Sequence, residues 1–148
     1  MSGLSGESSP KYILGYTSDE TVMLDFDDMK LKDVLYWSRR ALGRFGLGGF
    51  LVLESSPGSY HVVFDRGVDW SMNMRVVAWV ALLSKKVKLR RWFLMQCIKQ
   101  KSTLRISKKF EISCVKSFPR IVHKEGLQDR EIASFLRYRD AILNICDS

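Results

Sequence analysis

One amphipathic helix pattern between two strongly apolar strand patterns restricts the fold more than any other feature of this sequence. Apolar side chains recur at three- and four-residue spacing from residue 31 to 45, at Leu31, Val34, Leu35, Leu42 and Phe45. This spacing predicts a helix with one buried face. Residues 21–27 (TVMLDFD) before it and 49–55 (GFLVLES) after it have strand patterns. A helix between two strands favours a crossover that lays the helix on one face of a sheet.

The remaining patterns extend this unit. Ser56-Pro57-Gly58 is a turn, so 59–65 (SYHVVFD) is the hairpin partner of 49–55. The other expected elements are strands at 12–15, 92–99 and 103–107 and helices at 72–86 and 129–145. The order favours an α+β chain with an antiparallel sheet of the ferredoxin-like or RNA-recognition-motif type. Helices back this sheet, extra strands and a C-terminal helix are added, and the opposite face is left open for a ligand.

Length and composition indicate one domain. The 148 residues fall within the usual range for one domain, and we assign residues 11–148 to it, after a flexible tail at 1–10 that is rich in Ser and Gly. No apolar run approaches the roughly 20 residues that a membrane helix needs. Three widely spaced cysteines form neither a disulfide framework nor a CxxC metal site. We therefore expect a cytoplasmic protein in a reducing compartment, with no membrane contact.

Positive charge is concentrated in one stretch. The formal net charge is +8, and residues 70–110 contain eleven Lys or Arg and no Asp or Glu. A long surface of one sign attracts polyanions. The nucleic-acid contacts predicted from this stretch are Lys85, Lys86, Lys88, Arg90 and Arg91. The alternatives are a solvated face or a surface that meets an acidic protein partner, and Trp70 and Tyr60 are candidates for stacking on bases.

The candidate chemistry lies on the central strands. Asp25 and Asp27 are two residues apart, so on a strand both carboxylates project from one face. Two close carboxylates repel each other, and a divalent metal commonly compensates for this. By the same alternation His61 shares a face with Ser59, and pairing of the two strands would bring this face beside the acids. The alternative is a pair of surface acids at a strand end, with Asp28 capping the next helix.

These residues resemble a known pattern. The string LDFD, followed after one helix by Ser59-Tyr60-His61, resembles motifs one and two of the archaeo-eukaryotic primase superfamily, over roughly residues 21–107. The resemblance implies the catalytic core of a primase or primase-polymerase, with Mg²⁺ or Mn²⁺ at Asp25 and Asp27. It also implies a nucleoside triphosphate whose phosphates contact Ser59, His61, Arg105 and Lys108.

The third acid of the family motif is missing. The family carries a hydrophobic-Asp motif on the strand after the second helix, where this chain has Gln96 or Cys97 in the segment WFLMQCIKQ. Loss of one of three carboxylates weakens a two-metal site. Asp65 or Asp69 could substitute, although both have the character of turn residues.

Two functional hypotheses follow. The first is a primase-like, metal-dependent nucleotidyltransferase in DNA replication or repair, acting on a DNA or RNA template and assisted by a replication partner protein. The second is a non-catalytic module that binds single-stranded nucleic acid on the same sheet. No HExxH, zinc-knuckle or P-loop pattern points to another chemistry.

Overall fold

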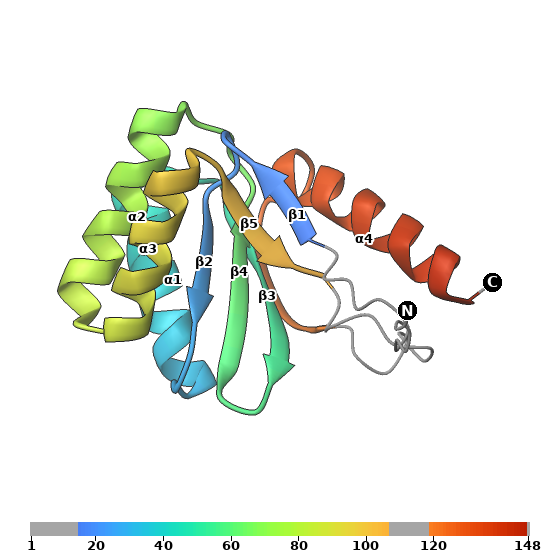
Figure 1. Cartoon of the computed structure of the whole chain (residues 1–148), viewed down its shortest axis with the longest axis horizontal. Coiled ribbons are helices and arrows are strands. Elements are labelled where there is room, and N and C mark those ends of the chain that lie inside the picture. The colour runs from blue at the N-terminus through green and yellow to red at the C-terminus, as the bar shows by residue number, and fades with distance from the viewer. Residues whose placement is uncertain (1–14, 107–118, 148) are drawn as a thin grey trace, which may run out of the picture.

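The structure is a computed structural model that describes residues 15–106 and 119–147. Figure 1 shows its elements in chain order. The strands are β1 (Gly15–Ser18), β2 (Met23–Phe26), β3 (Gly49–Ser56), β4 (Ser59–Phe64), β5 (Ser102–Arg105) and β6 (Arg120–Gly126). The helices are α1 (Leu31–Phe45), α2 (Trp70–Ser84), α3 (Val87–Lys99) and α4 (Glu131–Asp147).

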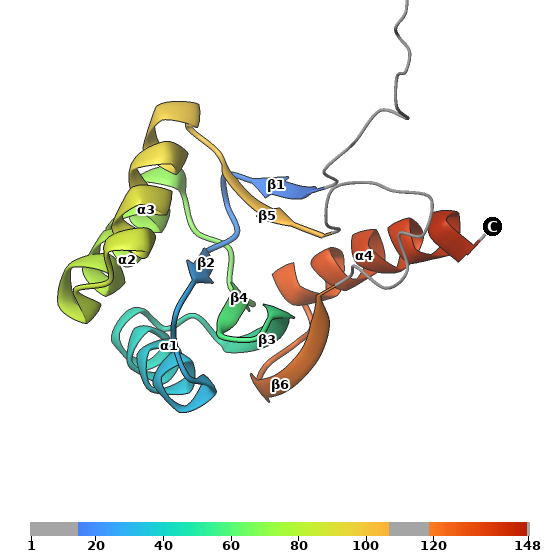
Figure 2. The same ribbon diagram turned by 60° about the horizontal axis from the view of Figure 1, so that its bottom comes forward.

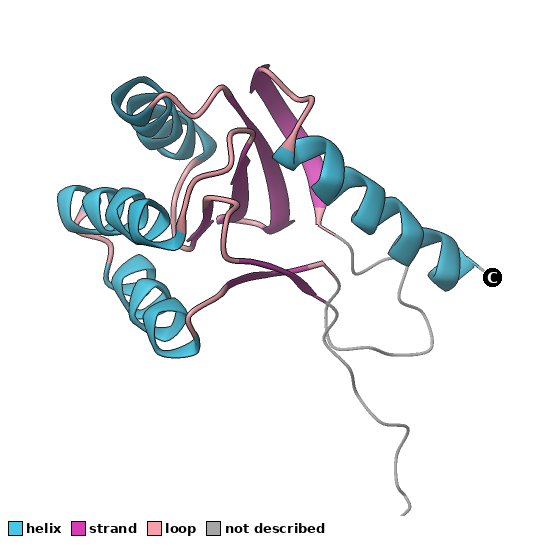
Figure 3. Ribbon diagram, turned by 90° about the horizontal axis from the view of Figure 1, so that it is seen from above, coloured by secondary structure: helices cyan, strands magenta, loops and turns pink. Residues whose placement is uncertain are grey.

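The strands form two antiparallel sheets. The larger sheet has the order β2-β4-β3-β6, and β1 pairs with β5 in a separate two-stranded sheet. The predicted hairpin is present as β3–β4, with Phe50 opposite Phe64 and Leu53 opposite His61. In Figure 3 helices α1, α2 and α3 lie on one side of the strands and α4 lies on the other. The prediction of an α+β chain built on antiparallel strands is confirmed.

The first face of the larger sheet packs against α1, α2 and α3. Leu24, Phe26, Val52 and Val62 are fully buried in this core. The predicted helix 31–45 is confirmed, and it ends at Gly46, whose φ of +63° is the left-handed conformation that glycine adopts at low cost. The helix predicted for 72–86 begins two residues earlier, because the Asp69 side chain accepts a hydrogen bond from the Met72 amide and caps it.

The second face of the larger sheet is covered, which corrects the prediction of an open face. Met23, Leu51, Leu53 and Val63 project from it and are buried with apolar residues of β5 and α4. Figure 2 shows β5 and α4 on the side of the sheet away from α1–α3. The physical signal is present in β3, where Phe50 and Leu51 are apolar neighbours that point to opposite faces. Such a strand is buried on both faces.

The predicted strand 92–99 is wrong, because this segment belongs to helix α3. Its buried residues, Leu89 and Gln96, are seven residues apart and so lie on one helical face two turns apart. The short run WFLM contains enough aromatic and apolar residues to resemble a strand, and periodicity over so few residues does not separate the two. The helix ends at Gln100, which adopts φ +60°.

The predicted strand 103–107 corresponds to β5, but this strand pairs with β1. Gly15 lies opposite Arg105 and Ser18 opposite Ser102. In a ferredoxin-like arrangement the strand after the second helix would extend the larger sheet. Here β5 lies outside the larger sheet, whose strand order is β2-β4-β3-β6.

The remaining predictions concern the two ends of the chain and membrane spans. The tail at 1–10 and residues 12–14 of the first expected strand lie outside the described residues. The helix predicted for 129–145 is present as α4, which begins at Glu131. Within the described parts of the chain, none of the helices has the length and hydropathy required to span a bilayer.

Candidate functional site

The carboxylate of Asp25 and the imidazole of His61 face each other across two paired strands. Strand β2 pairs with β4 so that the Cα atoms of Asp25 and His61 are direct partners. The Nε2 atom of His61 lies 3.6 Å from Oδ1 of Asp25. The predicted placement of these side chains on one face of the sheet is therefore confirmed.

Asp27 and Ser59 form the next contact along the same pair of strands. The hydroxyl of Ser59, the first residue of β4, donates a hydrogen bond of 2.7 Å to Oδ1 of Asp27. The turn at Gly58, with φ +83°, holds the two segments together, because its carbonyl accepts a hydrogen bond from the Met29 amide. The structure thus brings together Asp25, Asp27, Ser59 and His61, which we call the acid–histidine cluster.

Burial and like charge set the protonation of the cluster. Burial, followed by the nearby charge of Asp27, raises the pKa of Asp25 to about 7. Burial, followed by the positive charge of Arg105, lowers the pKa of His61 to about 4. Only 4% of His61 is exposed, whereas 27% of the Asp25 side chain is exposed. Solvent therefore reaches the cluster through Asp25, Asp27 and Ser59, which are partly exposed, rather than through His61.

Arg105 supplies positive charge to the cluster. It lies at the end of β5, the strand that follows the α2–α3 pair. Its charge acts on both members of the central pair, since it lowers the pKa of His61 and opposes the rise in the pKa of Asp25. The sequence predicted Arg105 as a phosphate contact, and the structure places it close to the acids and the imidazole.

The residues proposed for the third acidic position have other partners. Gln96 is buried in α3, where its Nε2 donates to the Trp92 carbonyl and its Oε1 accepts from the Thr103 amide. Cys97 is also on α3, and its thiol lies 3.6 Å from the sulfur of Met74. Because the segment is a helix, neither residue has the strand position that the motif requires.

The two alternative acids are helix caps. Oδ1 of the fully buried Asp65 accepts hydrogen bonds from the amides of Arg130 and Ile132, at the start of α4. Asp69 caps α2 in the same manner. These contacts give each side chain a role in helix capping, although Oδ2 of Asp65 is buried without a hydrogen-bond partner. The structure brings neither residue into the acid–histidine cluster.

Two lysines of the basic stretch contact Asp28, next to the cluster residue Asp27. The Nζ atom of Lys88 lies 2.9 Å from a carboxylate oxygen of Asp28, and Lys86 donates to the Asp28 carbonyl at 3.4 Å. Asp28 therefore binds α3 rather than capping α1, whose N-cap is Lys30. These contacts join the start of α3 to the segment that carries Asp27.

The other predicted nucleic-acid contacts differ in their surroundings. Arg90 donates to the carbonyls of Ala81 and Leu82 at the end of α2. Lys85 and Arg91 are exposed. Lys108 lies outside the described residues. Tyr60 is 7% exposed and its hydroxyl donates to Glu54, so the prediction that its ring is open for base stacking is wrong for this structure.

The described residues do not contain a complete metal cage. Between 15 and 106 and between 119 and 147 there is no group of three or more His, Cys, Asp or Glu that could hold a metal ion. The donors that the cluster does offer are the two carboxylates, which agrees with the preference of Mg²⁺ for one or two carboxylates completed by water and phosphate oxygens.

The sequence did not reveal that His61 is buried or that Lys88 binds Asp28. Burial of His61 follows from packing on the second face of the sheet, which the two-sided apolar pattern of β3 indicates. The contact of Lys88 with Asp28 joins residues 60 positions apart, and no local pattern signals it.

Comparisons with known proteins add no identification. The chain matches no protein-family model, no curated protein and no solved structure. The functional interpretation therefore depends on the cluster itself and on the resemblance of its two short motifs to those of primases.

Proposed function

We propose that this chain is a primase-like domain that joins nucleotides on a nucleic-acid template in DNA replication or repair. The observation that supports it is the direct pairing of Asp25 with His61 across β2 and β4. The resemblance implies that two acids and a histidine share one site. In the sequence these residues lie in segments separated by α1, β3 and a turn. The hydrogen bond from Ser59 to Asp27 adds the small residue of the second motif to the same site.

The carboxylates would hold Mg²⁺ or Mn²⁺. The pKa of Asp25 is raised to about 7 partly by the charge of Asp27, and a divalent cation would relieve this repulsion and favour the ionised form. Such a metal, when bound, neutralises charge that develops on the phosphates. Asp25 and Asp27 therefore fit a metal, although the site offers two carboxylates where the family has three.

The remaining residues would bind and orient the substrate. A neutral His61 can donate one hydrogen bond to a phosphate oxygen of a nucleoside triphosphate that approaches from the partly exposed side of the cluster, where Asp25 lies. Arg105 would contribute positive charge beside the same phosphates. Ser59 would orient Asp27, and Lys86 and Lys88 would place further positive charge where the template approaches.

A primer-synthesis assay tests this function. The purified chain is incubated with a single-stranded template and nucleoside triphosphates, with Mg²⁺ or Mn²⁺ and with a chelator. Asp25→Asn and Asp27→Asn should each reduce incorporation about 100-fold or more, since metal contacts contribute several kcal/mol to such reactions. Asp33→Asn, an exposed acid in the first turn of α1, is the matched control and should keep full activity. Incorporation that survives both site substitutions would refute the catalytic assignment.

A specific observation supports a second candidate, the non-catalytic nucleic-acid-binding module. The strand after the α2–α3 pair brings a cation, Arg105, to the cluster, where the family motif has an acid. A positive group balances the two acids without metal and suits phosphate binding. Labelled single-stranded oligonucleotide binding at increasing salt tests this module. Replacement of Lys88 and Arg91 by Gln should reduce the salt slope by about 2, and binding without incorporation would favour the module over the enzyme.

A further inference from the structure

Helices α2 and α3 expose apolar side chains on the side that faces away from the sheet. The two helices form a hairpin joined by Lys85 and Lys86. Three of the leucine and isoleucine side chains on it are largely exposed, namely Leu82 (61%), Leu94 (58%) and Ile98 (76%). Leu94 and Ile98 are four residues apart and so lie on one face of α3. Clustered apolar exposure of this kind marks an interaction surface.

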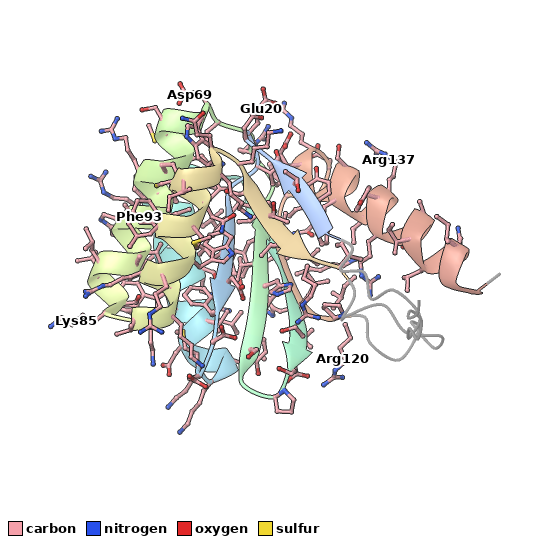
Figure 4. All side chains as sticks on the ribbon, in the orientation of Figure 1. Glu20, Asp69, Lys85, Phe93, Arg120 and Arg137 are labelled. Atoms are coloured by element: carbon pink, nitrogen blue, oxygen red, sulfur yellow. The ribbon has the colours of Figure 1, made fainter. Side chains whose placement is uncertain are left out.

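A hollow lies between the two helices within this surface. It has a volume of about 230 Å³ and is lined by Ala78, Ala81, Leu82, Arg90, Phe93 and Leu94. On the α2 side the small side chains of Ala78 and Ala81 leave the hollow open. On the α3 side Phe93 and Leu94 form its wall. Figure 4 shows Phe93 on the helices at the side of the molecule opposite to α4. We call this hollow, together with Ile98, the α2–α3 groove.

The rim of the groove is positively charged. From residue 70 to 106 the sequence has no Asp or Glu. Arg75, Lys85, Arg91 and Lys99 are exposed on the two helices, and Lys85 is seen at one end of them in Figure 4. The guanidinium of Arg90 is held by the carbonyls of Ala81 and Leu82 at the edge of the hollow. The charged side chains of the two helices are therefore all basic, and one of them, Arg90, lines the hollow.

We propose that the α2–α3 groove binds an amphipathic helix of a partner protein, with leucine-like side chains on one face and Asp or Glu on its flanks. The apolar face of such a helix would fill the hollow, in the way that helices bind grooves through residues at three- and four-residue spacing. Its acids would meet the basic rim and guide the approach of the two proteins. This inference does not rest on the proposed function, because no residue of the acid–histidine cluster lines the groove.

Charge and shape argue against other occupants. A symmetric pairing of two copies through this surface would bring two acid-free basic surfaces together, which repel each other. A nucleic-acid backbone would be attracted by the basic rim but would gain nothing from burying Leu94 or Ile98. A lipid surface suits protruding apolar side chains, whereas this surface is hollowed between its helices.

A peptide-binding experiment tests the proposal. The probe is a labelled amphipathic peptide of 15 residues, the length of α2, with Leu on one face and Glu on the others. A second peptide carries Lys in place of every Glu. Binding is followed by fluorescence anisotropy, and the contacted residues are located by amide chemical-shift changes in the labelled protein.

Variants distinguish binding at the α2–α3 groove from non-specific binding to any exposed apolar residue. The double variant Leu94→Gln, Ile98→Gln should weaken binding of the acidic peptide about tenfold, as expected for central apolar contacts. Ile145→Gln changes an equally exposed residue (69%) on α4 and should leave binding unchanged. Unchanged melting temperatures for these variants would show that the fold is retained, as expected for exposed positions.

The expected result is that the acidic peptide binds, the basic peptide does not, and shifts are confined to α2 and α3. Failure of the acidic peptide to bind, or equal binding of both peptides, would overturn the proposal. It would also be overturned if the Leu94 and Ile98 substitutions instead reduced binding to an oligonucleotide, to phosphatidylglycerol vesicles or between copies of the chain. Primer synthesis by the same variants should be unchanged, so failure here is distinguishable from failure of the proposed function.

Discussion

The Nε2 atom of His61 lies 3.6 Å from Oδ1 of Asp25, yet these groups do not form the usual ion pair of carboxylate and imidazolium. Burial and Asp27 raise the pKa of Asp25 to about 7, while burial and Arg105 lower the pKa of His61 to about 4. Between these values the carboxyl carries the proton and the imidazole is neutral. The Asp25 carboxyl is therefore suited to exchange its proton for a cation, which is the property that a metal site requires.

The first prediction concerns stability and pH. When the pKa of an acid is higher in the folded than in the unfolded state, ionisation of that acid destabilises the fold. The loss of stability occurs as the pH rises from the pKa of the unfolded state to the pKa of the folded state. For Asp25 this window runs from 3.8 to about 7. A histidine whose pKa is lowered acts oppositely, and for His61 stability rises between about 4 and 6.5. The two contributions oppose each other in the native chain.

Single substitutions should separate these contributions. Asp25→Asn should leave the His61 contribution, so that the free energy of unfolding increases by about 2 kcal/mol from about pH 4.5 to about pH 6.5. His61→Gln should leave the Asp25 contribution and give a decrease of similar size. Urea denaturation across this range measures both. Parallel pH profiles for the two variants would show that the assigned protonation states are wrong.

The second prediction concerns Arg105 as the charge that acts on both groups. Arg105→Gln should raise the pKa of Asp25 further above its usual range and should also raise the pKa of His61 toward 6.5, because one positive charge disfavours the proton on each. Arg105→Lys keeps the charge and should change both less. NMR titration of the His61 ring and the Asp25 carboxyl measures these shifts, and a fall in either pKa would contradict the placement of Arg105.

The third prediction concerns the hydrogen bond from Ser59 to Asp27. Ser59→Ala should destabilise the chain by about 1 kcal/mol, the typical net contribution of one partly buried hydrogen bond. A double-mutant cycle with Asp27→Asn tests whether the two residues act together. We expect a coupling free energy of about 0.5–1.5 kcal/mol, measured by urea denaturation. Strict additivity would show that the contact contributes nothing to stability.

The fourth prediction concerns two glycines with different surroundings. A Cβ at Gly49 would overlap the backbone of Leu127, so Gly49→Ala should cost more than about 3 kcal/mol or prevent folding. Gly43 lies inside α1, where an added methyl group would meet no atom within 4 Å. Gly43→Ala should therefore stabilise the chain by about 0.5–1 kcal/mol through helix propensity. Thermal unfolding of the two variants, which differ from the native chain by the same methyl group, measures both effects.

The sequence was informative where the local pattern was long or bounded by a clear turn, in contrast to residues 92–99. Helix periodicity determined α1 at Leu31–Phe45, and the Ser56-Pro57-Gly58 turn determined the β3–β4 hairpin. Strand alternation predicted which side of its strand each of Asp25 and His61 occupies. The pairing of β2 with β4 then brings these two sides together on one face of the sheet. These features were predictable because periodicity and turn chemistry are local properties of the chain.

The tertiary structure decided which distant segments meet. It pairs β5 with β1, packs α4 over the second face of the sheet, and so buries His61 on a face that was expected to be open. It also places Arg105 beside the acids and makes Trp92 part of a helix rather than a strand. Contacts of this kind depend on the packing of apolar faces that a strand such as β3 presents on both sides. The sequence predicted one open face, and only the folded chain shows that β5 and α4 bury it.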